Sequence, residues 1–210
     1  MKLYLVRHGQ SAGNAKGIHQ HASVGLSELG VNQSTVLAKR FLTIPVDVII
    51  ASPFERARQT AEIITNAINK PIKMDDLLTE IKRPSVIEGR RLDEPEVVKI
   101  KADIAANAHD PNWRHSDEET FFDIRARALA FLKHLDSMAD EHVLVVTHGH
   151  FIKAIVGVMM YGEELTPAQN QAFMNTFAMS NTSVTACAKE PGAHWRVLQW
   201  NDDAHLGELA

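Results

Sequence analysis

The sequence predicts an open α/β sheet, because short apolar runs that fit buried strands alternate with longer segments carrying apolar residues at helical spacing. Three of these runs, residues 3–6, 46–50 and 143–146, are closely followed by polar or cationic side chains. Ligand sites of α/β proteins lie where parallel strands end, so these three ends are expected to share one crevice. In residues 182–200, two runs suited to strands flank a Pro-Gly turn, and the first of them alternates apolar and polar residues. This pattern predicts an antiparallel hairpin at the sheet edge.

The length of 210 residues fits one domain, residues 1–210, better than two. A formal net charge of −4 argues against general affinity for nucleic acid or for membrane surfaces, so any anion site must be local. The single cysteine, Cys187, cannot form an intramolecular disulfide and suits a reducing compartment. With no apolar stretch of membrane-spanning length and no signal-peptide pattern, we expect a cytoplasmic protein.

The turn after the first strand carries several groups suited to chemistry. Arg7 offers a planar fork of donors for phosphate or carboxylate, and His8 can act as base, ligand or nucleophile near neutral pH. Gly9 is expected to let the backbone pass close to a bound group. Ser11 and Asn14 add small polar side chains within the same turn.

Residues 16–25 predict a loop over this site, being rich in Gly, His, Gln and Ser. His19 and His21 alternate in it, but no Cys, Asp or Glu at metal-ligand spacing accompanies them, so no metal site is expected. A helix over 27–42 follows, with Ser27 as its N-cap, and Pro45 separates it from the second strand. Its apolar face is expected to comprise Val31, Ser34, Leu37, Ala38 and Phe41.

The second strand leads into a predicted helix over 52–69, with Ser52 as the cap and Pro53 at the first position. The positive end of this helix then faces the sheet edge. Arg56 lies in the first turn, where a positive charge does not stabilise the helix. We therefore expect its side chain to have a role other than helix stabilisation. Arg58 is interpreted as a solvated helix charge.

Residues 72–74 predict a short third strand, and residues 81–118 predict a loop or lid insertion. Pro84, Gly89 and Pro95 interrupt this region, although residues 97–108 can form a helix. Glu80 and Glu88 are its candidate carboxylates. A long helix is predicted over 119–139, capped by Ser116 or Asp117; its apolar set is Phe122, Ile124, Ala128, Leu129, Phe131, Leu132 and Leu135.

The third strand-terminal motif is His148-Gly149, which repeats the His-Gly arrangement of the first strand. A single histidine there would more often be structural. Two such units together with an arginine-bearing helix indicate a shared anion site.

Three stretches, residues 5–14, 51–62 and 145–150, resemble the histidine phosphatase superfamily, also called phosphoglycerate mutase-like. Residues 26–30 resemble the helix start of that family, and residues 200–206 resemble many of its tails. The resemblance implies a three-layer α/β/α sandwich with a mostly parallel central sheet, and a reaction through a phosphohistidine without metal or cofactor.

The resemblance also implies roles for individual residues. His8 is similar to the nucleophile, Arg7 and Arg56 to the phosphate clamps, and His148 to a second imidazole in the pocket. The remaining phosphate-contacting positions that it implies are Gln10, Asn14 and Gly149. For His8 to attack phosphorus, its other ring nitrogen must be held as a donor, which a backbone carbonyl can do.

Glu80 falls where one branch of the family has its general acid, and Glu88 is the alternative. The sequence after Glu80 departs from the usual family pattern, and His150 stands where glycine is more usual. Glu119 is interpreted as a rim contact. Contacts to the leaving group are expected from Arg83, Arg90, Arg91 and Trp113.

The leading interpretation is a phosphomonoesterase that acts on a small phosphorylated metabolite. The alternatives are a cofactor-dependent phosphoglycerate mutase and a non-catalytic module that binds a phospho-ligand. The presence of both a candidate nucleophile, His8, and a candidate acid, Glu80, favours an enzyme over a module that only binds its ligand. The sequence leaves the substrate open, and the apolar terminal hairpin could pair across a homodimer.

Overall fold

Six short segments form one sheet in the order β3-β2-β4-β1-β5-β6, and the computed structural model describes residues 1–209. The first four strands pair in parallel, and β5 and β6 join antiparallel as a terminal hairpin. Their bounds are β1 Lys2–Arg7, β2 Val48–Ala51, β3 Ile72–Met74, β4 His142–Thr147, β5 Val184–Ala188 and β6 Arg196–Asp202. The mostly parallel sheet and the edge hairpin are therefore confirmed.

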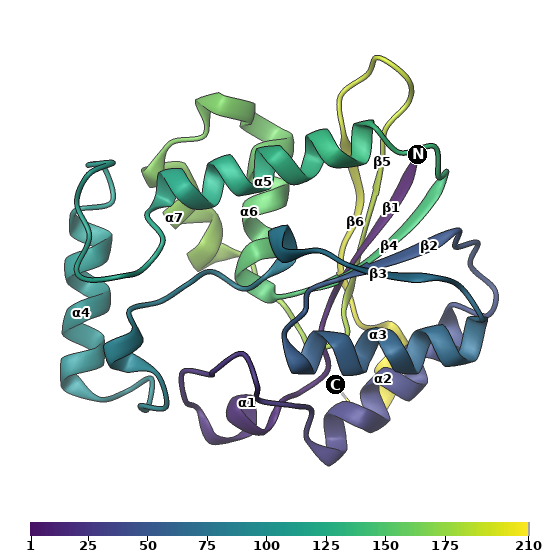
Figure 1. The fold of residues 1–210 in the computed structure, drawn as a ribbon, viewed down its shortest axis with the longest axis horizontal. Helices are drawn as coiled ribbons and strands as arrows, with labels where there is room; N and C mark the ends of the chain where they lie inside the picture. Colours follow the sequence, from purple (N-terminus) through teal and green to yellow (C-terminus); the bar gives the residue numbers. More distant parts are fainter. Residues whose placement is uncertain (210) are drawn as a thin grey trace.

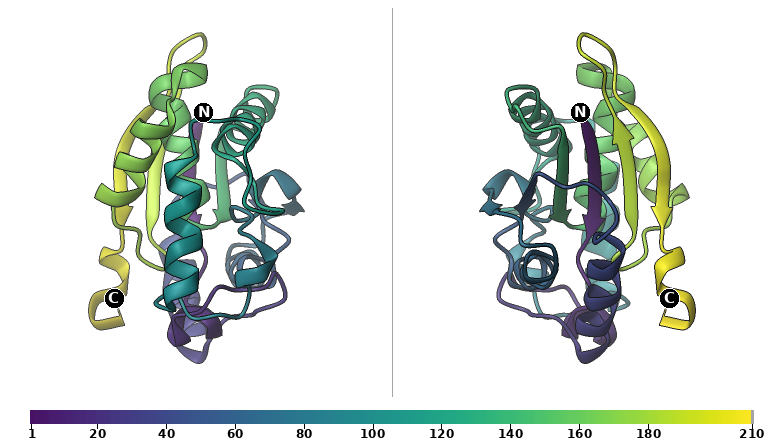
Figure 2. Two further views of the ribbon diagram at one scale, coloured as in Figure 1. Left: turned by 90° about the vertical axis from the view of Figure 1, so that its left-hand side faces the viewer. Right: turned by 90° about the vertical axis from the view of Figure 1, so that its right-hand side faces the viewer.

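Helices cover both faces of the sheet, which confirms the three-layer sandwich (Figure 1). Helices α2 (Glu28–Arg40) and α3 (Glu55–Ile68) pack on one face, and α5 (Phe121–Asp136) and α6 (Gly149–Tyr161) pack on the other. Strands β1, β2 and β4 are apolar on both sides because each contributes to both cores. Figure 2 shows the hairpin, in yellow, at the outer edge of the molecule.

Several helix ends and faces differ from the sequence predictions. Helix α2 keeps Ser27 as its N-cap but ends at Arg40, and Val31 is exposed rather than buried. Helix α5 is capped by Thr120, not by Ser116 or Asp117, and it is shorter than 119–139. Phe121, rather than Phe122, is buried, because Phe121 lies three residues before Ile124 and so shares the buried face of the helix.

The 81–118 segment contains a short 3-10 turn, Ser85–Ile87, and helix α4, Pro95–Ala106. Ile87, Val97 and Ile100 form a small cluster separate from the two main cores. Backbone hydrogen bonds of 2.9 Å join His19 to Arg90 and Gly89, so this segment is tied to the loop after α1 (Ala12–Lys16). The remaining helix, α7 (Pro167–Thr176), packs on α6.

Glycines allow α2 to approach the turn after β1. A Cβ on Gly30 would lie 1.9 Å from the carbonyl oxygen of Gln10, and a Cβ on Gly9 would lie 2.5 Å from the oxygen of Gly30. The expectation that Gly9 serves a bound group is wrong, because its close neighbour is this helix backbone. Within residues 1–209, no helix combines the length and apolar character needed to cross a bilayer.

Candidate active site

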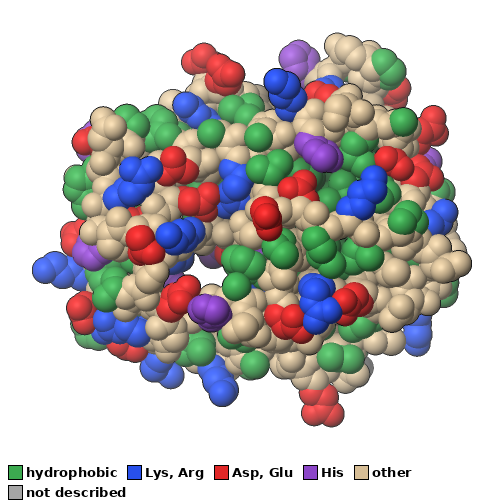
Figure 3. All heavy atoms as spheres, viewed as in Figure 1, with side chains coloured by type: hydrophobic (Ala, Val, Ile, Leu, Met, Phe, Trp, Pro, Cys, Tyr) green, Lys and Arg blue, Asp and Glu red, His purple; other side chains and the backbone are tan. Residues whose placement is uncertain are grey.

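A cavity of about 820 Å³ opens where β1, β2 and β4 end, between the sheet and the 81–118 segment. Figure 3 shows a hollow here with charged side chains around it. Most of the residues predicted for the site line this cavity; they are Arg7, His8, Asn14, Arg56, Glu80 and Gly149. Strands distant along the chain thus deliver these groups to one edge of the sheet.

His8 is only 2% exposed, and its neighbours define its tautomer. Nδ1 lies 2.7 Å from the carbonyl oxygen of Gly9, which can only accept, so Nδ1 carries the proton. Nε2 accepts a 3.2 Å hydrogen bond from Nε of Arg56. Burial, followed by the charges of His148, Arg56 and Arg7, lowers the pKa of His8 well below 6.5. The imidazole is therefore neutral at physiological pH, with its Nε2 lone pair free of a proton.

His148 is completely buried, and its ring centroid lies 5.0 Å from that of His8. Its Nε2 lies 2.9 Å from the hydroxyl of Ser52, whose oxygen accepts from the amide of Phe54. The Ser52 hydroxyl has no other acceptor for its proton among the described residues, so we assign it as the donor to Nε2, which leaves the proton of the ring on Nδ1. Nδ1 is buried without a hydrogen-bond partner among the described residues. Burial is the main cause that lowers the pKa of His148 to about 3; the charges of Arg56 and Arg7 act in the same direction, and the charge of Glu80 opposes them.

The prediction that Ser52 caps α3 is wrong. The helix begins at Glu55 with Phe54 at the N-cap position, and no side chain caps it. The bend introduced by Pro53 delays the helix, and the Ser52 hydroxyl is used to hold His148 instead.

The two arginines predicted as clamps reach the cavity from different elements, Arg7 from the end of β1 and Arg56 from α3. Arg56, in the first turn of α3, is 3% exposed and also donates to the carbonyl of His21 at 3.2 Å. Burial lowers its pKa to about 10, so it remains charged at neutral pH. Arg7 donates to the carbonyl of Met179, while its Nε is buried without a partner in the described chain. Arg58 instead pairs with Glu55 and Glu62 on the surface, which confirms it as a helix charge.

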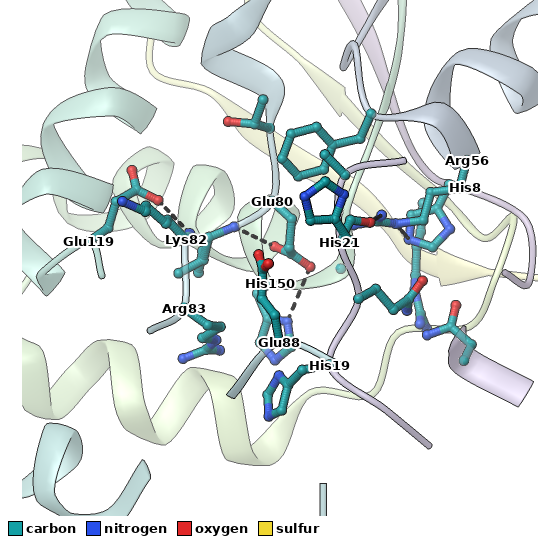
Figure 4. A pocket seen from close by; sticks show the side chains of 18 of the residues that line it. His8, His19, His21, Arg56, Glu80, Lys82, Arg83, Glu88, Glu119 and His150 are labelled. Carbon is teal, nitrogen blue, oxygen red and sulfur yellow. Dashed lines mark hydrogen bonds and ion pairs between the residues drawn. The ribbon is translucent and has the colours of Figure 1, made fainter. Parts of the chain in front are cut away.

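Glu80 lies beside His150 and faces the cavity (Figure 4). Its Oε2 is 3.3 Å from Nδ1 of His150, and its Oε1 accepts from the amide of Ile81 at 2.9 Å. Burial alone would raise the pKa of Glu80, but His150, His148 and the Ile81 amide together bring it well below 4.5. Glu80 is therefore a carboxylate at neutral pH.

Arg127 of α5 is a site residue that the sequence analysis missed. Its guanidinium donates to the carbonyls of Leu77 and Thr79 at 2.8 Å each and pairs with Glu119 at 2.8 Å. It therefore holds the segment that leads directly into Glu80. A cation at helical spacing among the apolar residues of α5 is the sequence signal that could have identified it.

Other predicted residues divide between the cavity and the surface. Glu88, Glu119 and Arg83 line the cavity, and Glu119 is already engaged by Arg127. Gln10 does not line it, because the side chain turns back to accept a 2.8 Å hydrogen bond from Ser27. The expected leaving-group contacts Arg90, Arg91 and Trp113 also lie outside it, the two arginines being paired with carboxylates of their own segment.

His19 and His21 both line the cavity. The ring of His21 bonds the hydroxyl of Ser23 at 2.9 Å, and Nε2 of His19 has no hydrogen-bond partner in the described part of the chain. Residues 1–209 contain no group of three or more His, Cys, Asp or Glu side chains arranged to hold a metal.

The geometry can hold a tetrahedral anion against a nucleophile. Two nitrogens that are buried without partners, Arg7 Nε and His148 Nδ1, belong to side chains around His8. Buried donors are costly unless satisfied, so both nitrogens are available to an oxyanion that binds beside His8. Since phosphoryl transfer needs mainly positioning and cationic donors, this arrangement suits it.

Comparison with known proteins agrees with this chemistry. The model of the histidine phosphatase superfamily (branch 1) matches residues 3–203. The chain is 32% identical over 158 residues to a protein of Hydrogenobacter thermophilus named "Putative phosphoserine phosphatase 2", covering 74% of this chain and 76% of the other. It is 25% identical over 165 residues to adenosylcobalamin/alpha-ribazole phosphatase of Salmonella typhi, covering 76% and 80%.

The chain also matches relatives that are named phosphoglycerate mutases. A protein of Photorhabdus laumondii named probable phosphoglycerate mutase is 28% identical over 162 residues, covering 76% of this chain and 75% of the other. Among solved structures, Bacillus stearothermophilus YhfR is 27% identical with a TM-score of 0.80, covering 98% of each chain.

Proposed function

The chain belongs to the histidine phosphatase superfamily, branch 1, and from this membership we propose that it hydrolyses small phosphate monoesters through a phosphohistidine on His8. It is a phosphatase, as its phosphatase-named relatives support. The observation that carries the proposed mechanism is the fixed tautomer of His8, whose Nδ1 donates to Gly9 and whose Nε2 faces the cavity.

In the first step, Nε2 of His8 attacks phosphorus in line and forms the N–P bond while the ester P–O bond breaks. The incoming phosphate displaces Nε2 from its hydrogen bond with Arg56, so the guanidinium becomes available to the phosphate oxygens. Arg7 Nε and His148 Nδ1 supply further donors, and Asn14 and Gly149 line the same end of the cavity. These donors stabilise charge on the equatorial oxygens.

The leaving alkoxide needs a proton, and Glu80 is the carboxyl group positioned to supply it. Although the protein by itself favours the ionised form of Glu80, the negative charge of a bound phosphate raises its pKa and favours the acid form. The resulting carboxylate then takes a proton from water, which attacks the phosphohistidine and releases inorganic phosphate. Glu88, the alternative acid, is exposed and makes no side-chain hydrogen bond within residues 1–209.

A rapid-quench experiment with an aryl phosphate tests the nucleophile. Wild-type protein should yield a phosphopeptide carrying the phosphoryl group on His8, and His8→Ala should lose both the phosphopeptide and the release of phosphate. His194→Ala, at an exposed histidine outside the cavity, is the matched control. Phosphate release that persists in His8→Ala would refute the mechanism.

Phosphoglycerate mutase remains the second candidate because relatives carry that name. A mutase would return the phosphoryl group to the phosphoglycerate skeleton, so net phosphate release and isomerisation of 3-phosphoglycerate distinguish the two reactions. Ester binding by calorimetry without turnover would instead indicate a binding module.

Two further proposals concern the cellular compartment of the enzyme and its oligomeric state. The buried thiol of Cys187, whose pKa burial raises to about 12, is unreactive and fits the reducing cytoplasm. A homodimer would bury Val197 and Leu198, which are exposed on the edge strand β6. Light scattering of the purified protein tests the dimer.

A further inference from the structure

The cavity extends well beyond the phosphate end, and its far side carries its own charges. Figure 4 shows Arg83 on the side of the cavity opposite His8 and Arg56, with Glu80 between them. A volume of about 820 Å³ is in the range that holds a drug-sized ligand, so room remains for a leaving group beside a bound phosphate.

Most cations on the far side are already paired. Lys82 lies 3.1 Å from Asp117, Arg127 pairs with Glu119, and Lys153 donates to the carbonyl of Met174 at 2.9 Å. Arg83 and Lys101 line the same cavity, yet neither side chain makes a hydrogen bond or ion pair with any residue in 1–209. They are the cations on this side that a ligand can engage.

Arg83 is half-buried, and burial lowers its pKa, so its charge is held there at a cost in solvation. Glu80 and Glu119 lie near enough to offset part of this effect. Both carboxylates are engaged elsewhere, Glu80 by His150 and Glu119 by Arg127. The positive charge of Arg83 therefore lacks a direct partner.

The side chain of His19 is influenced by the charges of both Arg83 and Lys101. Burial lowers the pKa of His19 to about 4, and the next causes are the charges of Arg83, Lys101 and His150. These groups come from three separate parts of the chain and line the same cavity as His19, whose Nε2 is buried without a partner in the described residues. Two unpaired cations therefore line this end of the cavity, where Glu88 is the carboxylate without an ion-pair partner among the described residues.

We propose that Arg83 and Lys101 form a second anion subsite, which holds a carboxylate or a second phosphate on the leaving group. The proposal rests on the proposed phosphatase function and narrows its substrates to small phosphomonoesters that carry another negative group. The planar guanidinium of Arg83 suits either anion, and Lys101 adds a charge from helix α4.

Two substrates with the same carbon skeleton isolate the second anion. 3-Phosphoglycerate carries a carboxylate where glycerol 3-phosphate carries a hydroxymethyl group. We expect wild-type kcat/KM to favour 3-phosphoglycerate by at least about tenfold, the smallest effect expected of a charge-assisted hydrogen bond. Fructose 1,6-bisphosphate against fructose 6-phosphate makes the same comparison for a second phosphate, so the two pairs show which anion the subsite prefers.

Arg83→Gln and Lys101→Gln should each reduce the preference ratio, by about 10- to 100-fold for Arg83. Arg91→Gln and Lys99→Gln remove the same charge from the same segment outside the cavity, so they should keep the wild-type ratio. Calorimetry in a His8→Ala background, which does not turn substrate over, should show weaker 3-phosphoglycerate binding when Arg83→Gln is added.

The outcomes separate this proposal from the proposed function. Wild-type hydrolysis of an aryl phosphate with no preference in either substrate pair would overturn the subsite and leave the phosphatase intact. If Arg91→Gln and Lys99→Gln also lose the preference for the substrate with the second anion, the subsite is overturned. The preference would then come from the overall positive charge of the segment and not from Arg83 and Lys101. If wild type hydrolyses none of the esters, the phosphatase proposal itself fails. Thermal unfolding of Arg83→Gln should show no loss of stability, because no protein contact is removed.

Discussion

The guanidinium of Arg56 and the imidazole of His8 meet directly, with Nε donating to Nε2 across 3.2 Å. The contact joins the first turn of α3 to the end of β1, although the residues are 48 positions apart in the chain. It places a permanent cation beside the atom proposed to attack phosphorus. The same cation helps keep that atom unprotonated.

Arg56→Lys should lower kcat/KM for any phosphomonoester by about 10² to 10³, because lysine lacks the fork that can bridge two phosphate oxygens. Steady-state kinetics with an aryl phosphate measure the loss. Arg58→Lys, two residues along the same helix and exposed, should remain near wild type. Equal losses in both variants would show that the helix, rather than the clamp, is responsible.

Arg127→Met should reduce kcat more for an alkyl phosphate than for an aryl phosphate, because only the poor leaving group depends on a well-placed Glu80. The variant removes the donors to Leu77 and Thr79 and leaves Glu119 without its ion-pair partner. We also expect a loss of about 2–4 kcal/mol in the free energy of unfolding, measured with urea.

Lys133→Met, on the exposed side of the same helix, controls for loss of charge on α5. If Arg127→Met slows aryl and alkyl esters by the same factor, Arg127 supports the fold only and does not position Glu80.

His150→Ala should move the basic limb of the kcat profile for glycerol 3-phosphate to higher pH, because kcat reports the pKa of Glu80 in the substrate complex. Burial raises the pKa of Glu80 while the charge and hydrogen bond of His150 lower it, so removal of His150 raises that pKa. The acid form of Glu80 then persists to higher pH. The profile for an aryl phosphate should not move, since its leaving group needs no proton. An alkyl-ester profile identical to wild type would exclude Glu80 as the acid.

The free energy of unfolding should fall as the pH drops from 6.5 towards 3. His148 protonates in the unfolded chain near pH 6.5 but in the folded protein only near pH 3, so the unfolded state binds more protons throughout this window. Its contribution is complete above pH 6.5, and at pH 4 about 3 kcal/mol of it is lost. His8, whose pKa is also lowered, acts in the same direction.

Urea unfolding at several pH values tests this dependence. His148→Gln should flatten the pH slope relative to wild type, and His194→Gln, at an exposed position, should keep it. A wild-type slope in His148→Gln would mean that other groups cause the acid sensitivity.

The errors of the sequence analysis have a common origin. Val31 and Phe122 lie near the starts of α2 and α5, and local spacing does not show how far the core extends over the first turn of a helix. Ser52 fits a helix cap by local rules, yet the structure uses its hydroxyl for His148, which lies 96 residues away. Arg127 was passed over because its partners, Leu77, Thr79 and Glu119, follow from packing between separate elements.

The amino-acid sequence by itself determined the parallel sheet, the edge hairpin and the ends of β1, β2 and β4 as the place where Arg7, His8, Arg56 and His148 gather. It could do so because hydrophobic periodicity and strand-end chemistry are local properties. Only the tertiary structure decided the tautomers of the two histidines, the pairing of Glu80 with His150 and the two free cations at the far end of the cavity. Hydrogen-bond partners and desolvation depend on which distant segments meet, and packing in three dimensions sets that.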